Sequence, residues 1–194
     1  MKIVPRENIR LARQEYLGRR IYFVTICTED RRSIFRDANR ATAAIAALRK
    51  VSEAMNFHVH AFCLMPDHAH ILVEGKTPAS DLVKFVAQWK QNTGYLFRRE
   101  IPRRFWQRRF YDHVLRRPED SDAVAWYIWM NPVRKGIMAE ASMYPFSGSF
   151  TVEWPKTKPE ISAWVPPWKS EEGAREYSVS WEGGRLRDCV CRGG

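Results

Sequence analysis

Apolar and polar positions along the body of the chain switch between strand-like and helix-like spacing. Residues 20–28 (RIYFVTICT) form a β-branched and aromatic run that is typical of a strand. Apolar side chains in residues 41–55 recur at helical spacing, which predicts an amphipathic helix. Residues 57–65 are apolar on both faces, as in a central strand, and residues 68–74 resemble a second strand directly after a Pro-Asp turn. These two strands predict an antiparallel hairpin.

The second half of the body predicts two more helices. Residues 80–81 (Ser-Asp) are typical helix caps, and apolar positions over residues 82–89 follow at helical spacing. We expect short strands over residues 105–111 and a last helix over residues 119–131, which Pro132 ends. A strand, a helix, a hairpin and two later helices predict a small α+β fold, with helices packed on an antiparallel sheet.

Composition sets the size of the folded body and the nature of its partner. With 45% hydrophobic and 13% aromatic residues, the 194-residue chain can form a proper core, which disfavours a disordered chain or a disulfide miniprotein. The net charge of +10 lies wholly in residues 1–147, because residues 148–194 contain seven basic and seven acidic side chains. We therefore expect a basic domain over 1–147 that contacts a polyanion, and a neutral, partly ordered tail over 148–194.

Hydropathy and cysteine spacing exclude other classes. No apolar run approaches the roughly 20 residues of a membrane-spanning helix, and the charged N-terminus lacks the apolar segment of a secretion signal. We therefore expect a cytoplasmic protein with no membrane partner. The four cysteines show neither zinc-finger spacing nor a CxxC pair, which disfavours a structural zinc protein.

Four of the five histidines form two His-x-His pairs on predicted strands. Residues two apart on a strand point to the same face, about 7 Å apart at the backbone, so either pair could converge on one divalent ion. His58 and His60 share the predicted strand face of Phe62 and Leu64, which favours a structural role in or beside the core.

His68 and His70 are the better candidates for ligands. They follow the Pro-Asp turn at the start of a strand, where side chains can reach a cleft. Ala69, Ile71 and Val73 supply the opposite, buried face of that strand. Spacing alone does not decide between metal ligands and ordinary buried histidines.

The last predicted helix carries a second candidate pair. Tyr127 and Asn131 are four residues apart, so they lie on one helix face, close to the apolar stripe of Val124 and Ile128 that should face the sheet. This helix could present a phenol and an amide oxygen to whatever the histidines bind. The alternative is a tyrosine at the edge of the core and an asparagine that ends a helix before proline.

Residues 97–117 combine arginines with aromatic rings. Arginines bind phosphates through two hydrogen bonds, and exposed aromatic rings stack on unpaired bases, so this pattern favours contact with nucleic acid, although some of the rings must belong to the core. The arginines are Arg98, Arg99, Arg103, Arg104, Arg108, Arg109, Arg116 and Arg117, and the rings are Phe105, Trp106, Phe110 and Tyr111.

Three runs of the sequence, taken together, resemble one known family. CLMPDHAHILVEG, FWQRRFYDHVLRR and YIWMNPVRKGI occur in this order, and they resemble the REP-associated tyrosine transposases, which are single-tyrosine HUH transposases related to those of small insertion sequences. The resemblance covers about residues 15–147 and not the tail. It implies a palm-like antiparallel sheet of the ferredoxin or RRM type, with helices packed on it.

The resemblance also implies roles for single residues. His68 and His70 match the two histidines of the HUH motif, which bind a divalent ion, Mg²⁺ or Mn²⁺. Tyr127 matches the nucleophile, and Asn131 matches the third, amide ligand. His113 lies in a segment that the family places near DNA or the active site, and Trp106 and the arginines are expected to contact DNA.

The activity implied by the resemblance is DNA transposition by a metal-dependent endonuclease and strand transferase. Its substrate would be a REP-type DNA hairpin with a flanking single strand, and the cut would proceed through a 5′-phosphotyrosine intermediate. The protein would be associated with the nucleoid in the cytoplasm. A monomer is favoured, although insertion-sequence relatives form dimers that exchange the tyrosine helix. The alternative is a domesticated, non-catalytic protein that binds hairpin DNA or RNA through the same basic surface.

Overall fold

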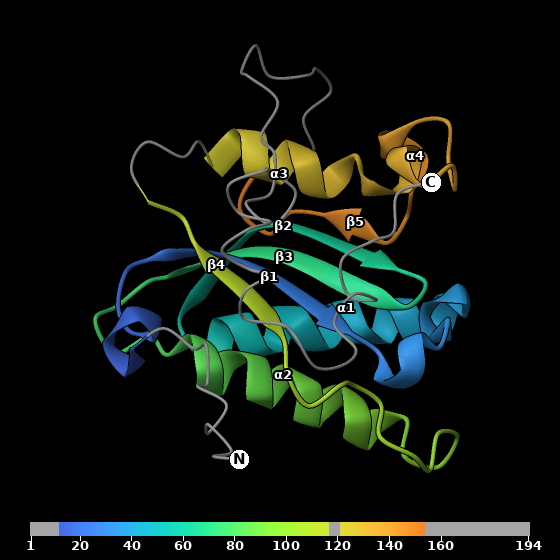
Figure 1. The fold of residues 1–194 in the computed structure, drawn as a ribbon, viewed down its shortest axis with the longest axis horizontal. Helices are drawn as coiled ribbons and strands as arrows, with labels where there is room; N and C mark the ends of the chain where they lie inside the picture. Colours follow the sequence, from blue (N-terminus) through green and yellow to red (C-terminus); the bar gives the residue numbers. More distant parts are fainter. Residues whose placement is uncertain (1–11, 117–120, 154–194) are drawn as a thin grey trace, which may run out of the picture.

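The computed structural model describes residues 12–116 and 121–153, and within them one five-stranded antiparallel sheet has helices on both faces (Figure 1). The strand order is β4-β1-β3-β2-β5. The strands are β1 (Ile21–Cys27), β2 (Phe57–Met65), β3 (His68–Gly75), β4 (Tyr111–Val114) and β5 (Ser147–Gly148). The α-helices are α1 (Ala38–Ala54), α2 (Leu82–Leu96), α3 (Ser121–Trp129) and α4 (Asn131–Arg134). Short 3₁₀ helices are η1 (Arg13–Tyr16), η2 (Glu29–Arg31), η3 (Ile34–Arg36) and η4 (Ala141–Met143). The predicted α+β class and the β2–β3 hairpin are confirmed.

Side-chain caps fix where the two long helices begin. The Asp37 carboxylate accepts a hydrogen bond from the Arg40 amide (3.1 Å), so α1 begins three residues before the predicted start. The Asp81 carboxylate accepts one from the Lys84 amide (3.2 Å), and α2 begins at the next residue, as predicted.

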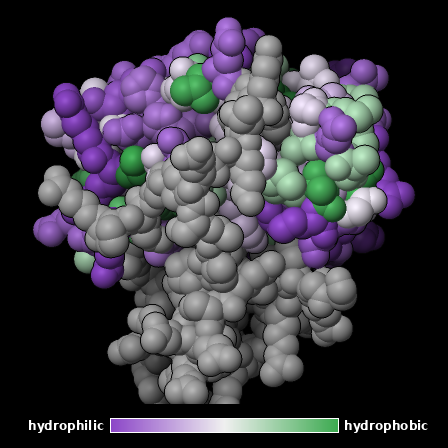
Figure 2. All heavy atoms as spheres, turned by 90° about the horizontal axis from the view of Figure 1, so that it is seen from above, coloured by the Kyte–Doolittle hydropathy of each residue, from purple (hydrophilic) through white to green (hydrophobic). Residues whose placement is uncertain are grey.

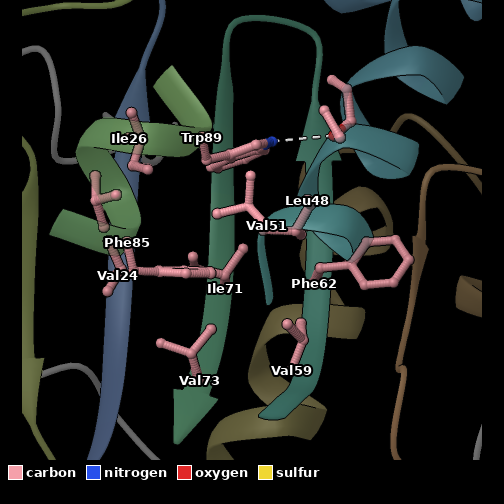
Figure 3. Close-up of a cluster of buried hydrophobic side chains, with 14 of the residues drawn as sticks. Val24, Ile26, Leu48, Val51, Val59, Phe62, Ile71, Val73, Phe85 and Trp89 are labelled. Carbon is pink, nitrogen blue, oxygen red and sulfur yellow. Dashed lines mark hydrogen bonds between the residues drawn. The ribbon is translucent and has the colours of Figure 1, made fainter. Parts of the chain in front are cut away.

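The larger core lies between the sheet and the helices α1 and α2. Val24, Ile71 and Val73 point from β1 and β3 towards Phe85 of α2 (Figure 3). The buried Trp89 indole donates a hydrogen bond to the Ala44 carbonyl of α1 (3.0 Å), which ties the two helices together. This layer makes the sheet a rigid support for the side chains on its other face.

A β-bulge in β2 changes which way its side chains face. The register against β3 shifts between Val59 and Ala61. Val59 packs in the α1/α2 core before the bulge, and Phe62 and Leu64 do so after it. Ala61 instead packs beneath α3, because the extra residue reverses the alternation of faces.

The bulge corrects the prediction that His58 and His60 share a face with Phe62 and Leu64. His58 lies opposite Glu74, on the other face of the sheet, and is exposed. His60 contacts the same Glu74 carboxylate through Nε2 (2.8 Å). The expected structural role of His60 therefore takes the form of a surface ion pair.

The structure moves two other predicted boundaries. The strand expected within residues 105–111 begins only at Tyr111, and Trp106 forms just an isolated bridge with Thr28. Pro132 lies in the first turn of α4, where its missing N–H is tolerated. Pro132 therefore begins a new helix, and α3 already ends at Trp129.

The folded body continues past the predicted domain end at residue 147. Strand β5 (Ser147–Gly148) straddles that boundary and pairs with β2. Phe150 then packs on Phe62 with 5.0 Å between ring centroids, and the Arg49 guanidinium lies 4.0 Å from the Phe150 ring. The neutral tail was expected from residue 148, and its part over residues 154–194 lies outside the described residues.

None of the helices formed by residues 12–116 and 121–153 is both long and apolar enough to span a bilayer.

Candidate active site

The His68-x-His70 pair lies on the sheet face that α3 covers. Strand alternation places both histidines on the same side as Leu72, which packs beneath α3. Both side chains are buried, each with 3% exposure, and their ring centroids are 4.7 Å apart. The expectation that they share one face and lie side by side is confirmed.

The two imidazoles are oriented by different oxygen atoms. His68 Nδ1 lies 2.6 Å from Oδ1 of Asp67, and His70 Nδ1 lies 2.8 Å from Oγ1 of Thr25. In a neutral imidazole that donates from Nδ1, the lone pair is on Nε2. Within the part of the chain that the structure describes, the Nε2 atoms of both rings are buried and receive no hydrogen bond. This is how metal-binding histidines are held, with one ring nitrogen on an oxygen and the other on the ion.

The Asp67 carboxylate is itself held by a cation. Its Oδ2 lies 3.0 Å from Nε of Arg31. Burial alone would raise the pKa of Asp67, but the hydrogen bond to His68 and the charges of His68 and Arg31 outweigh it and lower this pKa. Asp67 is therefore ionised at neutral pH and can hold the His68 ring in place.

Helix α3 brings Tyr127 to the same place. Val124 and Ile128 are fully buried against the sheet, as the predicted apolar stripe required. The Tyr127 ring lies 6.3 Å from the Phe23 ring, and Phe23 stacks on His70 at 5.4 Å. His70 and Tyr127 therefore pack on the same phenylalanine ring, on the face of the sheet that α3 covers.

Asn131 lies at the start of α4, four residues after Tyr127. It is 3% exposed, and its Nδ2 is buried without a hydrogen bond, like Nε2 of the two histidines. A half turn of the amide exchanges its nitrogen and oxygen, so Asn131 can offer an oxygen to an ion. Two imidazole nitrogens and an amide oxygen suit a divalent cation. Nowhere in residues 12–116 and 121–153 do three His, Cys, Asp or Glu side chains gather as a metal cluster, so an ion here would need this amide or oxygens from a ligand.

Other reactive groups lie near the histidines. Cys63 faces His70 across the hairpin, but burial raises the pKa of its thiol far above the usual value, so it is not a nucleophile at neutral pH. Tyr111 lies across from Thr25 and 6.4 Å from the Phe23 ring, which makes it the second tyrosine at the site. His113 pairs with Phe23 in the register, so it lies on the same sheet face, as its expected proximity to the active site requires.

The sequence did not single out Thr25, Asp67, Phe23 or Arg134. The Arg134 guanidinium lies 3.9 Å from the centre of the Tyr127 ring. Asp67 was interpreted only as a turn residue, and Thr25 only as part of an apolar strand. Their roles become visible once the register joins Thr25 to His70.

The arginines of the basic run lie on the surface. Arg117 is outside the described residues, and the other seven arginines of the run are exposed. Viewed from the side of α3, most of the described surface is hydrophilic (Figure 2). Trp106, in contrast, is 2% exposed and donates from Nε1 to Oγ1 of Thr93 (2.7 Å). The prediction that Trp106 contacts DNA is therefore wrong, because its ring lies in the core and has no face open to a base.

Comparison with known proteins tests the family resemblance. The chain is 25% identical over 159 residues to the REP-associated tyrosine transposase of Escherichia coli K12, covering 78% of this chain and 94% of that protein. Its fold matches a solved REP-associated tyrosine transposase bound to a REP hairpin, with a TM-score of 0.62, 23% identity, and coverage of 81% of this chain and 98% of the other. Residues 19–130 match the family model described as "Transposase IS200 like". This match covers more than half of the sequence, so the chain belongs to the IS200-like transposase family.

Proposed function

We propose that this protein cuts and rejoins single-stranded DNA beside a REP-type hairpin, with Tyr127 as the nucleophile. The observation that carries the proposal is the convergence of His68, His70 and Tyr127 on one side of the sheet through the shared Phe23 ring. Membership of a transposase family supports this class of reaction. The hairpin is proposed because the solved relative is bound to one.

His68, His70 and Asn131 are the residues that would hold a divalent ion. The Nε2 atoms of the two histidines are buried, the two rings lie 4.7 Å apart between centroids, and both rings are already oriented through Nδ1. A bound Mg²⁺ or Mn²⁺ would supply Lewis acidity to the scissile phosphate. Phosphate oxygens would complete a shell that suits these hard cations, although two imidazoles also accept zinc.

Tyr127 would attack the scissile phosphorus through its phenolic oxygen. The phenol gives up its proton, the new bond joins phosphorus to this oxygen, the bond to the 3′ oxygen breaks, and the 3′ oxygen takes up a proton in its place. The products are a 5′-phosphotyrosine and a free 3′-OH.

An ordinary phenol has a pKa of about 10 and is a weak nucleophile at pH 7. The Arg134 guanidinium lies 3.9 Å from the centre of the Tyr127 ring, and this cation–π contact would hold the ring in place for the attack. Because the phosphotyrosine keeps the energy of the broken bond, rejoining needs no ATP.

We propose that the exposed arginines hold the DNA through its phosphates. The surface side chains of this kind are Arg98, Arg99, Arg103, Arg104, Arg108, Arg109 and Arg116. They follow one another along the chain from the end of α2 to the end of β4, whose His113 lies on the catalytic face. DNA bound along this edge of the sheet would pass the histidine pair.

A covalent-capture assay tests the proposal. The parent protein, Mn²⁺ and a hairpin oligonucleotide with a flanking single strand should give a protein–DNA adduct that survives denaturation. Tyr127→Phe and added EDTA should each abolish it. Tyr111→Phe is the matched control, because Tyr111 also contacts Phe23 and its replacement should leave the adduct intact.

An adduct that persists in Tyr127→Phe and disappears in Tyr111→Phe would reassign the nucleophile. Hairpin binding without an adduct would instead support a non-catalytic binding protein.

A further inference from the structure

A groove of about 560 Å³ lies between helix α2 and the loop over residues 101–110. Helix α2 belongs to the layer that covers the other face of the sheet from the histidines (Figure 1). The groove is therefore separate from the catalytic site, and the chemistry proposed above does not use it. Its volume is in the usual range for a pocket that takes a small molecule.

The walls of this groove combine an apolar floor with a basic rim. Val83 and Ala87 of α2 and Ile101 of the loop contribute apolar surface. Arg98, Arg103 and Arg108 line it as well, and all three are exposed. A flat apolar ligand that carries negative charge would match both parts of this lining.

Buried contacts hold the two walls at a fixed separation. The buried Trp106 indole donates to Thr93 of α2 (2.7 Å). The Lys90 ammonium, also on α2, donates to the carbonyls of Gln107 (2.5 Å) and Arg108 (3.0 Å) on the loop. The groove is thus formed before a ligand arrives, which lowers the entropy cost of binding.

We propose that this groove binds one unpaired nucleotide of the DNA strand that flanks the hairpin, with the base on the apolar floor and its phosphate on the arginine rim. The identification of the ligand as DNA rests on the proposed function. The loop runs directly into β4, the edge strand that carries His113 on the catalytic face. A single strand that follows this edge can therefore reach the groove and the histidine pair at the same time. Recognition of the flank is in this way separated from the chemistry.

Gly94 allows the groove to be filled without removing charge. It lines the groove within α2, and a Cβ built there meets no atom within 4 Å. A leucine at this position would occupy the space of the base and would also favour the helix over glycine. The matched control is Ala46→Leu, which adds similar bulk in the neighbouring groove between α1 and α2.

The test measures binding by fluorescence anisotropy in the Tyr127→Phe background without divalent ion, so it does not depend on the cleavage chemistry. The probes are one DNA hairpin with the flanking strand and the same hairpin without it. We expect Gly94→Leu to weaken binding of the flanked hairpin about 10-fold and to leave the bare hairpin unchanged. Ala46→Leu should change neither affinity.

Two outcomes would overturn the proposal. Unchanged binding of the flanked hairpin by Gly94→Leu would show that no nucleotide enters the groove. Equal weakening of both probes would show that the groove contacts the duplex of the hairpin and not the flanking strand. If circular dichroism shows that Gly94→Leu is misfolded, Arg103→Gln decides, since it should weaken only the flanked probe. Failure of the parent protein to form the covalent adduct in the capture assay would refute the proposed cleavage and leave these binding results standing.

Discussion

At the scale of single residues, the site depends on side chains that hold other side chains. Thr25 is 3% exposed in the middle of β1, where an apolar residue would be expected. Its hydroxyl instead lies against His70 Nδ1. We infer that Thr25 is a positioning residue, which fixes the tautomer and the direction of His70.

Replacing Thr25 should therefore weaken metal binding without removing a ligand. Thr25→Val keeps the shape of the side chain but removes the oxygen, and we expect Mn²⁺ affinity to fall about 10- to 100-fold. Isothermal titration calorimetry with Mn²⁺ and no DNA measures this directly. Thr25→Ser keeps the hydroxyl and should restore most of the affinity. Parent-like Mn²⁺ binding by the valine variant would exclude this role for Thr25.

The same residues show how far the sequence could predict the site. The spacing of His68 and His70, and of Tyr127 and Asn131, could be identified because strand and helix periodicity are local properties. The partnership of Thr25 with His70 depends on the pairing of β1 with β3, which no local pattern contains. Trp106 was misjudged because a basic, aromatic run does not reveal which of its rings face inward.

At the scale of elements, β3 and α3 of one chain bring the candidate residues to the same face of the sheet. His70 on β3 and Tyr127 on α3 contact the same Phe23 ring of β1. No exchange of the tyrosine helix between two chains is needed to bring them together. We therefore propose that the protein acts as a monomer.

Mixing two inactive variants tests this assembly. Tyr127→Phe lacks the nucleophile, and His68→Ala lacks a metal ligand, so each should give no adduct alone. If each chain builds its own site, an equimolar mixture should also give none. In a dimer that exchanges α3, one site of each mixed dimer would combine the intact histidines of one chain with the intact tyrosine of the other. The mixture would then recover about a quarter to a half of the parent activity. Recovery of the adduct would contradict the monomeric assembly.

Most elements were predictable because their periodicity and caps are encoded in short stretches. The hairpin and α2 begin at the expected residues, with Asp81 as the cap. The bulge at Val59–Ala61 was not predictable, since the extra residue leaves β2 apolar on both faces in either register. Pro132 was read as a helix end, although the first turn of a helix is also a position that proline favours.

At the scale of the whole molecule, the net charge of +10 should control the affinity for DNA. Contacts between arginines and phosphates release counterions, so the logarithm of the binding constant should fall linearly with the logarithm of the salt concentration. This dependence separates the proposed phosphate contacts from contacts that read bases.

Single arginine substitutions should change the slope of that dependence. Arg99→Gln and Arg109→Gln each remove an exposed charge of the basic run, and each should reduce the slope by about 1 in a titration of hairpin DNA from low to high salt. Arg40→Gln is the control, because Arg40 is already paired with Glu100 (3.0 Å). A slope that is the same in Arg99→Gln, Arg109→Gln and the parent would place the DNA elsewhere on the surface.

The bulge in β2 also restricts how the length of this strand can change. Phe57 and Val59 face the α1/α2 core, and Phe62 and Leu64 face the same core, although Phe62 follows Val59 by three residues and not by two or four. Deletion of His60 would remove the extra residue and keep the facing of every later side chain, whereas deletion of one residue just after the bulge would invert them, so that Cys63 would enter the wrong layer and the wall opposite His70 would be lost. The geometry of the histidine pair is thus tied to the number of residues that follow the bulge in a neighbouring strand, and insertions or deletions there should be tolerated far less well than substitutions.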